Sequence, residues 1–276
     1  MGGSTVWIGT SWKMNKTIAE ARAYVEELSR VPEPPGVQPF LLPAHTALAA
    51  VRDCRPPGSH LLLGAQNAHW GPEGAGTGEV SMRMVADAGA QLVEMGHSER
   101  RAQFGETDHS VSLKARAALD HHLTPLVCVG EPLSARRTGE AETYVVAQVR
   151  RALSGVRPEE IGSVLVAYEP VWAIGAGGRP AEPPEVAPVM AAIAEAIAQL
   201  SAGGGCRALL YGGGVDLDNA AALLGDPATD GLFVGRAAWT VGGLLGLIAI
   251  GAVHRGSDQG MLSHHRTDPK DHDQAP

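Results

Sequence analysis

Short apolar runs alternate along the chain with longer segments in which apolar and polar positions follow a helical period. The apolar runs are typical of buried parallel strands, and the sequence predicts them at 6–10, 40–42, 61–65, 92–95, 126–129, 164–167, 208–211 and 231–234. The periodic segments predict helices at 18–30, 45–52, 82–89, 98–104, 110–122, 140–153, 185–200, 219–224 and 244–253.

This alternation predicts parallel strands that are joined by right-handed crossovers through helices. Eight such units in about 250 residues suit a closed (β/α)₈ barrel, an α/β fold, and a doubly wound open sheet is the alternative. No change of composition marks a linker, so we expect one domain over residues 1–253. Residues 254–276 are polar and rich in His and Asp, and we expect them to form a disordered tail.

The charge and cysteine content exclude several classes of protein. The formal net charge is -8, and the 22 basic residues form no run, which argues against nucleic-acid or acidic-membrane binding. The 3 cysteines form no Cys-x-x-Cys pair, as expected in a reducing cytoplasm. The first residues show no basic stretch followed by an apolar core, so we expect no secretion. The longest apolar run is interrupted by glycines, so we expect no transmembrane helix. We therefore expect a cytoplasmic protein without membrane or nucleic-acid partners.

The first candidate for chemistry is a carboxylate at the end of a buried strand. Glu169 follows the apolar run 164–167, and the segment behind it is fixed by Pro170 and ends at Gly175. Barrels of this kind keep their active sites at the C-terminal ends of the strands. Glu169 therefore fits a general base under a lid, although a solvated loop charge would give the same local pattern.

Two further candidates follow the first and fourth expected strands. Lys13 lies just beyond the first strand, at the same end of the barrel, where a plain surface lysine is the alternative. His97 precedes an expected helix start, whose partial positive charge favours a neutral imidazole that donates a hydrogen bond. A packed structural histidine is the alternative there. Glu99 is expected to form an ion pair with Lys13 or Arg100.

Glycines follow the last two expected strands, at 212–214 and at Gly235, which precedes Arg236. Glycine lets backbone N–H groups approach an anion closely, and these two loops often hold a phosphate in barrels. The histidine pairs at 121–122 and 264–265 lack further ligands at metal spacing, so we expect no metal site.

Taken together, these stretches resemble the triosephosphate isomerase family. The matching segments are 12–15, 64–67, 77–79, 96–101, 168–175 and 211–213, and they occur in the family's order. They extend over nearly all of the chain before the tail. The resemblance implies a TIM barrel that acts as a ketose-phosphate isomerase of carbohydrate metabolism, including glycolysis. It implies proton transfer between adjacent carbons through an enediolate, without a metal or an organic cofactor.

The resemblance also assigns roles to the candidates. Glu169 would be the base, His97 would polarise the carbonyl and move protons between the oxygens, and Lys13 would stabilise the negative charge. Glu99 would support Lys13. Thr77 lies on the loop that, in the family, inserts into a neighbouring subunit, which implies a homodimer.

The phosphate would be held by backbone amides of Gly175, Gly214 and Gly235, and its binding would help to close the lid over the intermediate. The sequence departs from the family here. Gly214 replaces the usual serine, and the lid after Gly175 is longer and lacks the usual Thr-Gly-Lys-Thr-Ala hinge. Arg236 replaces a second glycine. It would cost about 1–2 kcal/mol in a left-handed backbone, or its guanidinium would add a contact to the phosphate.

Ser11 is a further departure, because the triose enzymes usually have asparagine at this position. The sequence also resembles a branch of the family that converts L-erythrulose 1-phosphate to D-erythrulose 4-phosphate. Its substrate carries an extra hydroxymethyl group on the reacting carbon, and the small Ser11 and the altered lid favour this substrate. The pair dihydroxyacetone phosphate and glyceraldehyde 3-phosphate is the close alternative. A phosphosugar-binding barrel without turnover is a second class of function.

Overall fold

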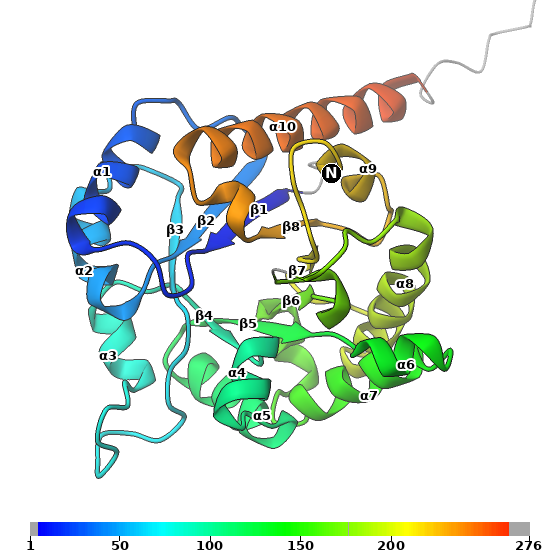
Figure 1. Cartoon of the computed structure of the whole chain (residues 1–276), viewed down its shortest axis with the longest axis horizontal. Helices are drawn as coiled ribbons and strands as arrows, with labels where there is room; N and C mark the ends of the chain where they lie inside the picture. The colour runs from blue at the N-terminus through cyan, green and yellow to red at the C-terminus, as the bar shows by residue number, and fades with distance from the viewer. Residues whose placement is uncertain (1–4, 176, 265–276) are drawn as a thin grey trace, which may run out of the picture.

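The structure is a computed structural model that describes residues 5–175 and 177–264. Within this part of the chain, the strands form a closed barrel in sequence order, and β1 pairs with β8 in parallel (Figure 1). The strands are β1 Val6–Ser11, β2 Val37–Leu42, β3 Leu62–Ala65, β4 Leu92–Met95, β5 Thr124–Val129, β6 Leu165–Tyr168, β7 Ala208–Tyr211 and β8 Gly231–Val234. The predicted (β/α)₈ barrel is confirmed, and the doubly wound sheet is excluded.

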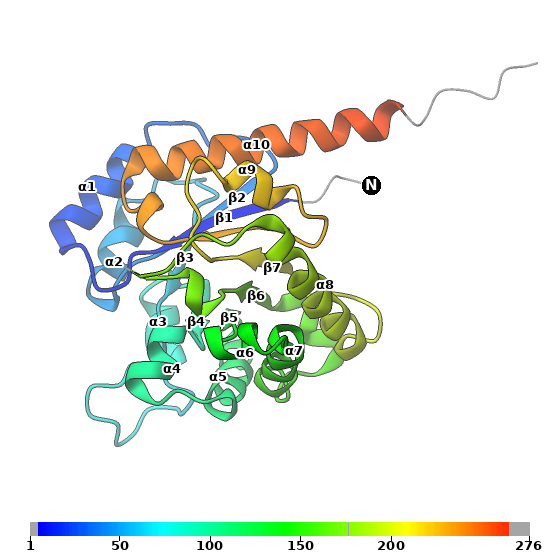
Figure 2. The ribbon, with the colours of Figure 1, turned by 45° about the vertical axis from the view of Figure 1, so that its right-hand side comes forward.

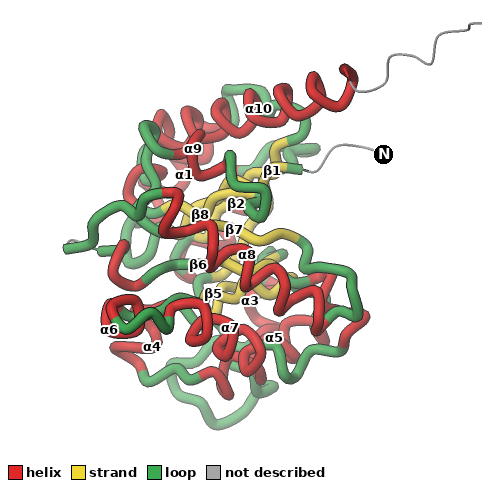
Figure 3. Tube along the Cα trace, turned by 90° about the vertical axis from the view of Figure 1, so that its right-hand side faces the viewer, coloured by secondary structure: helices red, strands yellow, loops and turns green. Residues whose placement is uncertain are grey.

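Helices surround this barrel, as the red segments around the yellow strands show (Figure 3). The α-helices are α1 Ile18–Leu28, α2 His45–Cys54, α3 Met82–Asp87, α4 Ser98–Phe104, α5 Asp108–Asp120, α6 Leu133–Arg137, α7 Ala141–Ala152, α8 Pro183–Leu200, α9 Ala220–Leu224 and α10 Val241–His264. Short 3-10 helices lie at η1 Pro158–Ser163, η2 Val171–Ala173 and η3 Arg236–Ala238. No helix in the described part of the chain combines the length and the apolar character that a bilayer span requires.

The strands are apolar on both faces because two separate layers cover them. One layer packs between the strands and the helices, and the other fills the inside of the barrel. Inside, Phe40 stacks on Phe233 with ring centroids 5.7 Å apart. A Cβ on Gly9 would lie 2.2 Å from the Phe40 ring, so only glycine leaves room for this aromatic filling. The site therefore lies above a barrel interior that is filled with side chains.

The last helix is longer than the sequence predicts. We expected it to end at Val253, where the polar composition begins, but α10 continues to His264 and extends beyond the barrel (Figure 2). Apolar composition indicates which residues are buried, whereas the hydrogen bonds of a helix are internal and can continue without a buried face. The expected tail overlaps this helix, and its remaining residues, 265–276, lie outside the described part.

Candidate active site

A cavity of about 480 Å³ opens at the C-terminal end of the barrel strands. Its lining includes every residue that the sequence predicts for catalysis or substrate binding: Ser11, Lys13, His97, Glu99, Glu169, Gly175, Gly214, Gly235 and Arg236. Thr77 is not part of the lining and lies on an exposed loop between β3 and α3. The fold therefore brings the predicted residues together from the C-terminal ends of five different strands and the loops that follow them.

Lys13 is held in an uncommon backbone conformation. Its φ of 53° places it in the left-handed region, which costs a residue with a side chain about 1–3 kcal/mol. The side-chain amide of Gln66 donates to the Lys13 carbonyl at 3.0 Å and supports this turn. The Lys13 ammonium lies 2.7 Å from the Glu99 carboxylate, while Arg100 pairs with Glu106 instead. Of the two ion pairs considered from the sequence, the structure shows the one with Lys13.

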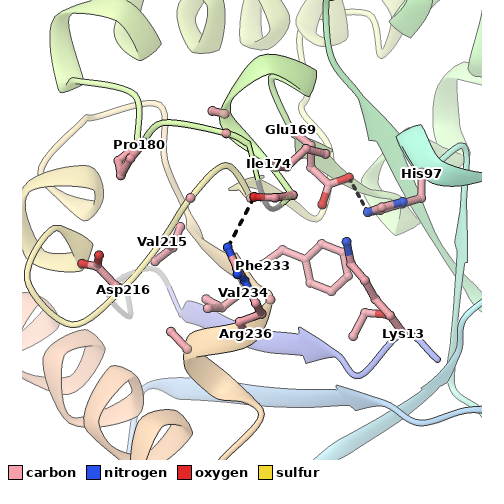
Figure 4. Close-up of a pocket in the computed structure, with 18 of the residues that line it drawn as sticks. Lys13, His97, Glu169, Ile174, Pro180, Val215, Asp216, Phe233, Val234 and Arg236 are labelled. Atoms are coloured by element: carbon pink, nitrogen blue, oxygen red, sulfur yellow. Dashed lines mark hydrogen bonds and ion pairs between the residues drawn. The ribbon is translucent and has the colours of Figure 1, made fainter. Parts of the chain in front are cut away.

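His97 is the N-cap of α4, and this position determines which ring nitrogen carries the proton. Its Nδ1 accepts a hydrogen bond from the backbone N–H of Glu99 at 3.1 Å. A ring nitrogen that accepts a hydrogen bond carries no proton, so the imidazole is neutral and its proton is on Nε2. Nε2 lies 3.6 Å from Oε2 of Glu169 (Figure 4). The ring therefore presents a donor to the cavity beside the carboxylate.

Glu169 directly follows β6, and only 5% of its surface is exposed. Among the described residues, its Oε2 atom has no hydrogen-bond partner. A Cβ on Gly212 would lie 2.8 Å from the Glu169 Cγ, so the glycine after β7 makes the space for this side chain. A buried carboxylate with an unpaired oxygen at a cavity wall is suited to accept a proton from a bound molecule.

A second buried carboxyl group, Glu94, lies close to Glu169 and was missed in the sequence analysis. Glu94 is 3% exposed and accepts a hydrogen bond from the Ser11 hydroxyl at 3.0 Å. Burial raises the pKa of Glu94 to about 7, and the charge of Glu169 adds to this effect. His97, the hydrogen bond from Ser11 and Lys13 act in the opposite direction. The signal was present in the sequence, because Glu94 is the one charged residue within an apolar strand.

The base of the lid is anchored by contacts that the sequence does not predict. Glu131 is fully buried and accepts hydrogen bonds from the Trp172 indole at 2.7 Å and from the Tyr168 hydroxyl at 3.0 Å. The Arg179 guanidinium lies 4.7 Å from the Trp172 ring centroid. It also donates to both carboxylate oxygens of Glu185, at 2.8 and 2.6 Å, and holds the pKa of Glu185 at about 2. The lid is thus tied to the start of α8.

Backbone turns form the other end of the cavity. Gly175 and Gly214 adopt φ angles of 81° and 61°, which suit glycine. Arg236 is not among the residues with positive φ and instead begins η3. The left-handed backbone strain that the sequence analysis considered for Arg236 therefore does not occur. Its guanidinium donates to the Gly175 carbonyl at 3.3 Å (Figure 4). Arg236 therefore links the loop after β8 to the lid.

These groups define what the cavity can do chemically. A carboxylate, a neutral imidazole and an ammonium surround one volume, so a bound molecule could lose a proton while its oxygen is polarised and its charge stabilised. In the part of the chain that the structure describes, no group of three or more His, Cys, Asp or Glu side chains could hold a metal ion. Activity without a cofactor stays a prediction from the family resemblance.

Comparison with known proteins agrees with this geometry. The sequence model of the family described as "Triosephosphate isomerase" matches residues 6–251. The chain is 48% identical over 259 residues to the L-erythrulose-1-phosphate isomerase of Mycolicibacterium smegmatis, covering 92% of this chain and 96% of the relative. It is 47% identical over 246 residues to the protein of the same name from Rhizobium rhizogenes, covering 88% and 93%. A Brucella abortus protein of that name is 45% identical over 248 residues, covering 88% and 95%.

Proposed function

Because the chain belongs to the triosephosphate isomerase family, and is therefore a sugar-phosphate isomerase, we propose that its substrate is a four-carbon ketose phosphate. The proposed reaction converts L-erythrulose 1-phosphate to D-erythrulose 4-phosphate. The observation that carries this proposal is the similarity, over nearly the whole chain, to relatives that are named for the first of these compounds. The buried Ser11 supports it, since a small side chain leaves room at the reacting carbon for a hydroxymethyl group.

The proposed mechanism uses the three groups around the cavity. Glu169 takes the proton from C3 of the ketose, while Nε2–H of His97 donates to the C2 carbonyl oxygen. The product of this step is an enediolate, and the ammonium of Lys13 stabilises its negative charge. His97 then moves a proton between the two oxygens, and Glu169 returns its proton to C2, which leaves the carbonyl at C3. The net change is one proton moved from C3 to C2 and a second moved from the C3 oxygen to the C2 oxygen, so the oxidation and the reduction occur within the substrate and no redox partner is needed.

A comparison of substrates tests the proposal. The purified enzyme should show a kcat/KM for L-erythrulose 1-phosphate that is about a hundredfold higher than that for dihydroxyacetone phosphate, or about 2.7 kcal/mol in transition-state binding. A preference for the triose would overturn the four-carbon substrate and leave a triosephosphate isomerase, with a role in glycolysis. Absence of turnover on both compounds would instead favour the phosphosugar-binding barrel.

We further propose that Arg236 binds the substrate phosphate together with the amides of Gly175, Gly214 and Gly235. Its side chain is exposed to the cavity and already contacts the lid, so one guanidinium can hold both the phosphate and the closed loop. Replacing Arg236 with glutamine should raise KM about tenfold, with a smaller change in kcat, because a charge-assisted hydrogen bond is lost. Steady-state kinetics would check this, and an unchanged KM would exclude the contact.

We also propose a cytoplasmic homodimer. The loop that carries Thr77 is exposed from residue 72 to residue 79 and projects from the barrel between β3 and α3 (Figure 1). Met14, next to Lys13, is 97% exposed, so its apolar side chain is available to pack against a second subunit. Sedimentation velocity should give twice the 28.7 kDa mass of one chain, and Thr77→Arg should shift the protein toward the monomer. A monomeric wild type would contradict the proposal.

A further inference from the structure

A hydrogen bond crosses the inside of the barrel directly beneath the cavity. Ser11 ends β1 and Glu94 lies in β4, two strands that are not neighbours in the barrel. Glu94 is two residues beyond Leu92, which belongs to the apolar filling of the barrel, so both side chains point to the interior. The Ser11 hydroxyl lies 3.0 Å from Oε2 of Glu94, and Ser11 also lines the cavity.

The carboxyl group determines which role the hydroxyl can take. A serine hydroxyl has one proton and two lone pairs. In the structure the Ser11 hydroxyl donates to Oε2 of Glu94, so its proton points to the carboxyl group and only lone pairs remain for the cavity. The titratable groups that face Glu94 are His97, Glu169 and Lys13 at the cavity and Cys128 of β5 inside the barrel. None of them makes a hydrogen bond to the Ser11 hydroxyl in the described part of the chain.

We propose that Glu94 fixes Ser11 as a hydrogen-bond acceptor, and that Ser11 thereby selects ketose phosphates whose reacting carbon carries a hydroxymethyl group. This inference rests on the proposed four-carbon substrate and names the residues that recognise it. Ser11 contacts the substrate, whereas Glu94 acts through Ser11 and is a positioning residue.

The chemistry of the two substrates explains the selectivity. The extra hydroxymethyl group of the four-carbon ketose ends in a hydroxyl that can donate to the lone pairs of Ser11. The triose has a hydrogen atom at this place and leaves the acceptor unpaired in a buried position. A site that is built to pair a substrate hydroxyl discriminates against the analogue that lacks it, because its own polar group then stays unsatisfied.

Three variants test the inference through the ratio of kcat/KM on L-erythrulose 1-phosphate to kcat/KM on dihydroxyacetone phosphate. Glu94→Leu removes the acceptor and frees the serine proton, and Ser11→Ala removes the serine oxygen. Each should lower the ratio about tenfold, mainly through a higher KM for the four-carbon ketose. Glu94→Gln retains an acceptor oxygen and should keep the ratio within about threefold of the wild type. The double variant of Ser11→Ala and Glu94→Leu should match Ser11→Ala alone.

The outcomes separate the possible failures. Equal losses on both substrates in Glu94→Leu, or an unchanged ratio in Ser11→Ala, would show a purely structural pair and overturn the inference. If Glu94→Leu does not fold, Ser11→Ala and Glu94→Gln decide the question by the same ratio. A wild type that does not prefer the four-carbon ketose overturns the proposed substrate itself. A wild type that prefers it, with variants that retain the preference, overturns only the role of Ser11 and Glu94.

Discussion

Replacing Glu169 with glutamine should lower kcat for the ketose phosphate by about three orders of magnitude, within the range that a positioned general base contributes. Glutamine retains the size of the side chain but cannot take a proton at neutral pH. Its amide should still fit the space that Gly212 leaves, so the fold and KM should change little. Aspartate at this position keeps the carboxylate but withdraws it by one methylene group, and it should also depress kcat strongly.

Proton exchange provides a second measurement for Glu169. In deuterated water the wild type should incorporate deuterium at the reacting carbon, as followed by NMR, and Glu169→Gln should lose this exchange together with turnover. Glu195→Gln is the matched control, because it makes the same substitution on the exposed face of α8. This variant should keep kcat within about twofold of the wild type. Exchange that persists at the wild-type rate in Glu169→Gln would assign the base to another group.

The barrel, and the meeting of the candidate residues at one cavity, could be predicted because their signals are local. Each strand is a short apolar run, so β4, β7 and β8 were predicted with the bounds that the structure shows. The closed barrel places the ends of parallel strands at one edge, so residues at those ends reach one cavity without further information. His97 follows the same logic, because its capping of α4 depends only on the adjacent residues.

Other features depend on contacts between distant segments, which no local pattern contains. Ser11 and Glu94 meet across the barrel although 83 positions separate them. Trp172 joins the lid to Glu131 through a partner that lies 41 positions away. Arg236 was expected either to be strained or to contact a phosphate, and only the backbone of η3 shows that the left-handed conformation is absent. Such pairings follow from the three-dimensional arrangement of the strands and loops.

Lys13→Met should lower kcat/KM by about 10²- to 10³-fold, or about 2.7–4 kcal/mol, the range for loss of one group that stabilises an oxyanion. Methionine has nearly the length of lysine and no charge, so the backbone turn at Lys13 should persist. The loss should appear in both kcat and KM, because the ammonium would act on the enediolate and on the anionic substrate. A change in KM alone would show that Lys13 only binds.

The ion pair between Lys13 and Glu99 allows a second test of the role of Lys13. At 2.7 Å the carboxylate neutralises much of the ammonium charge before substrate arrives, and Lys13→Met leaves that carboxylate facing an anionic substrate. Adding Glu99→Gln to Lys13→Met should therefore recover part of the lost affinity, seen as a lower KM, but should not restore kcat. Lys16→Met is the control, since the Lys16 ammonium donates to the Trp239 carbonyl and does not line the cavity. Its kcat should stay within about threefold of the wild type, because only the lysine at the cavity wall can stabilise the enediolate.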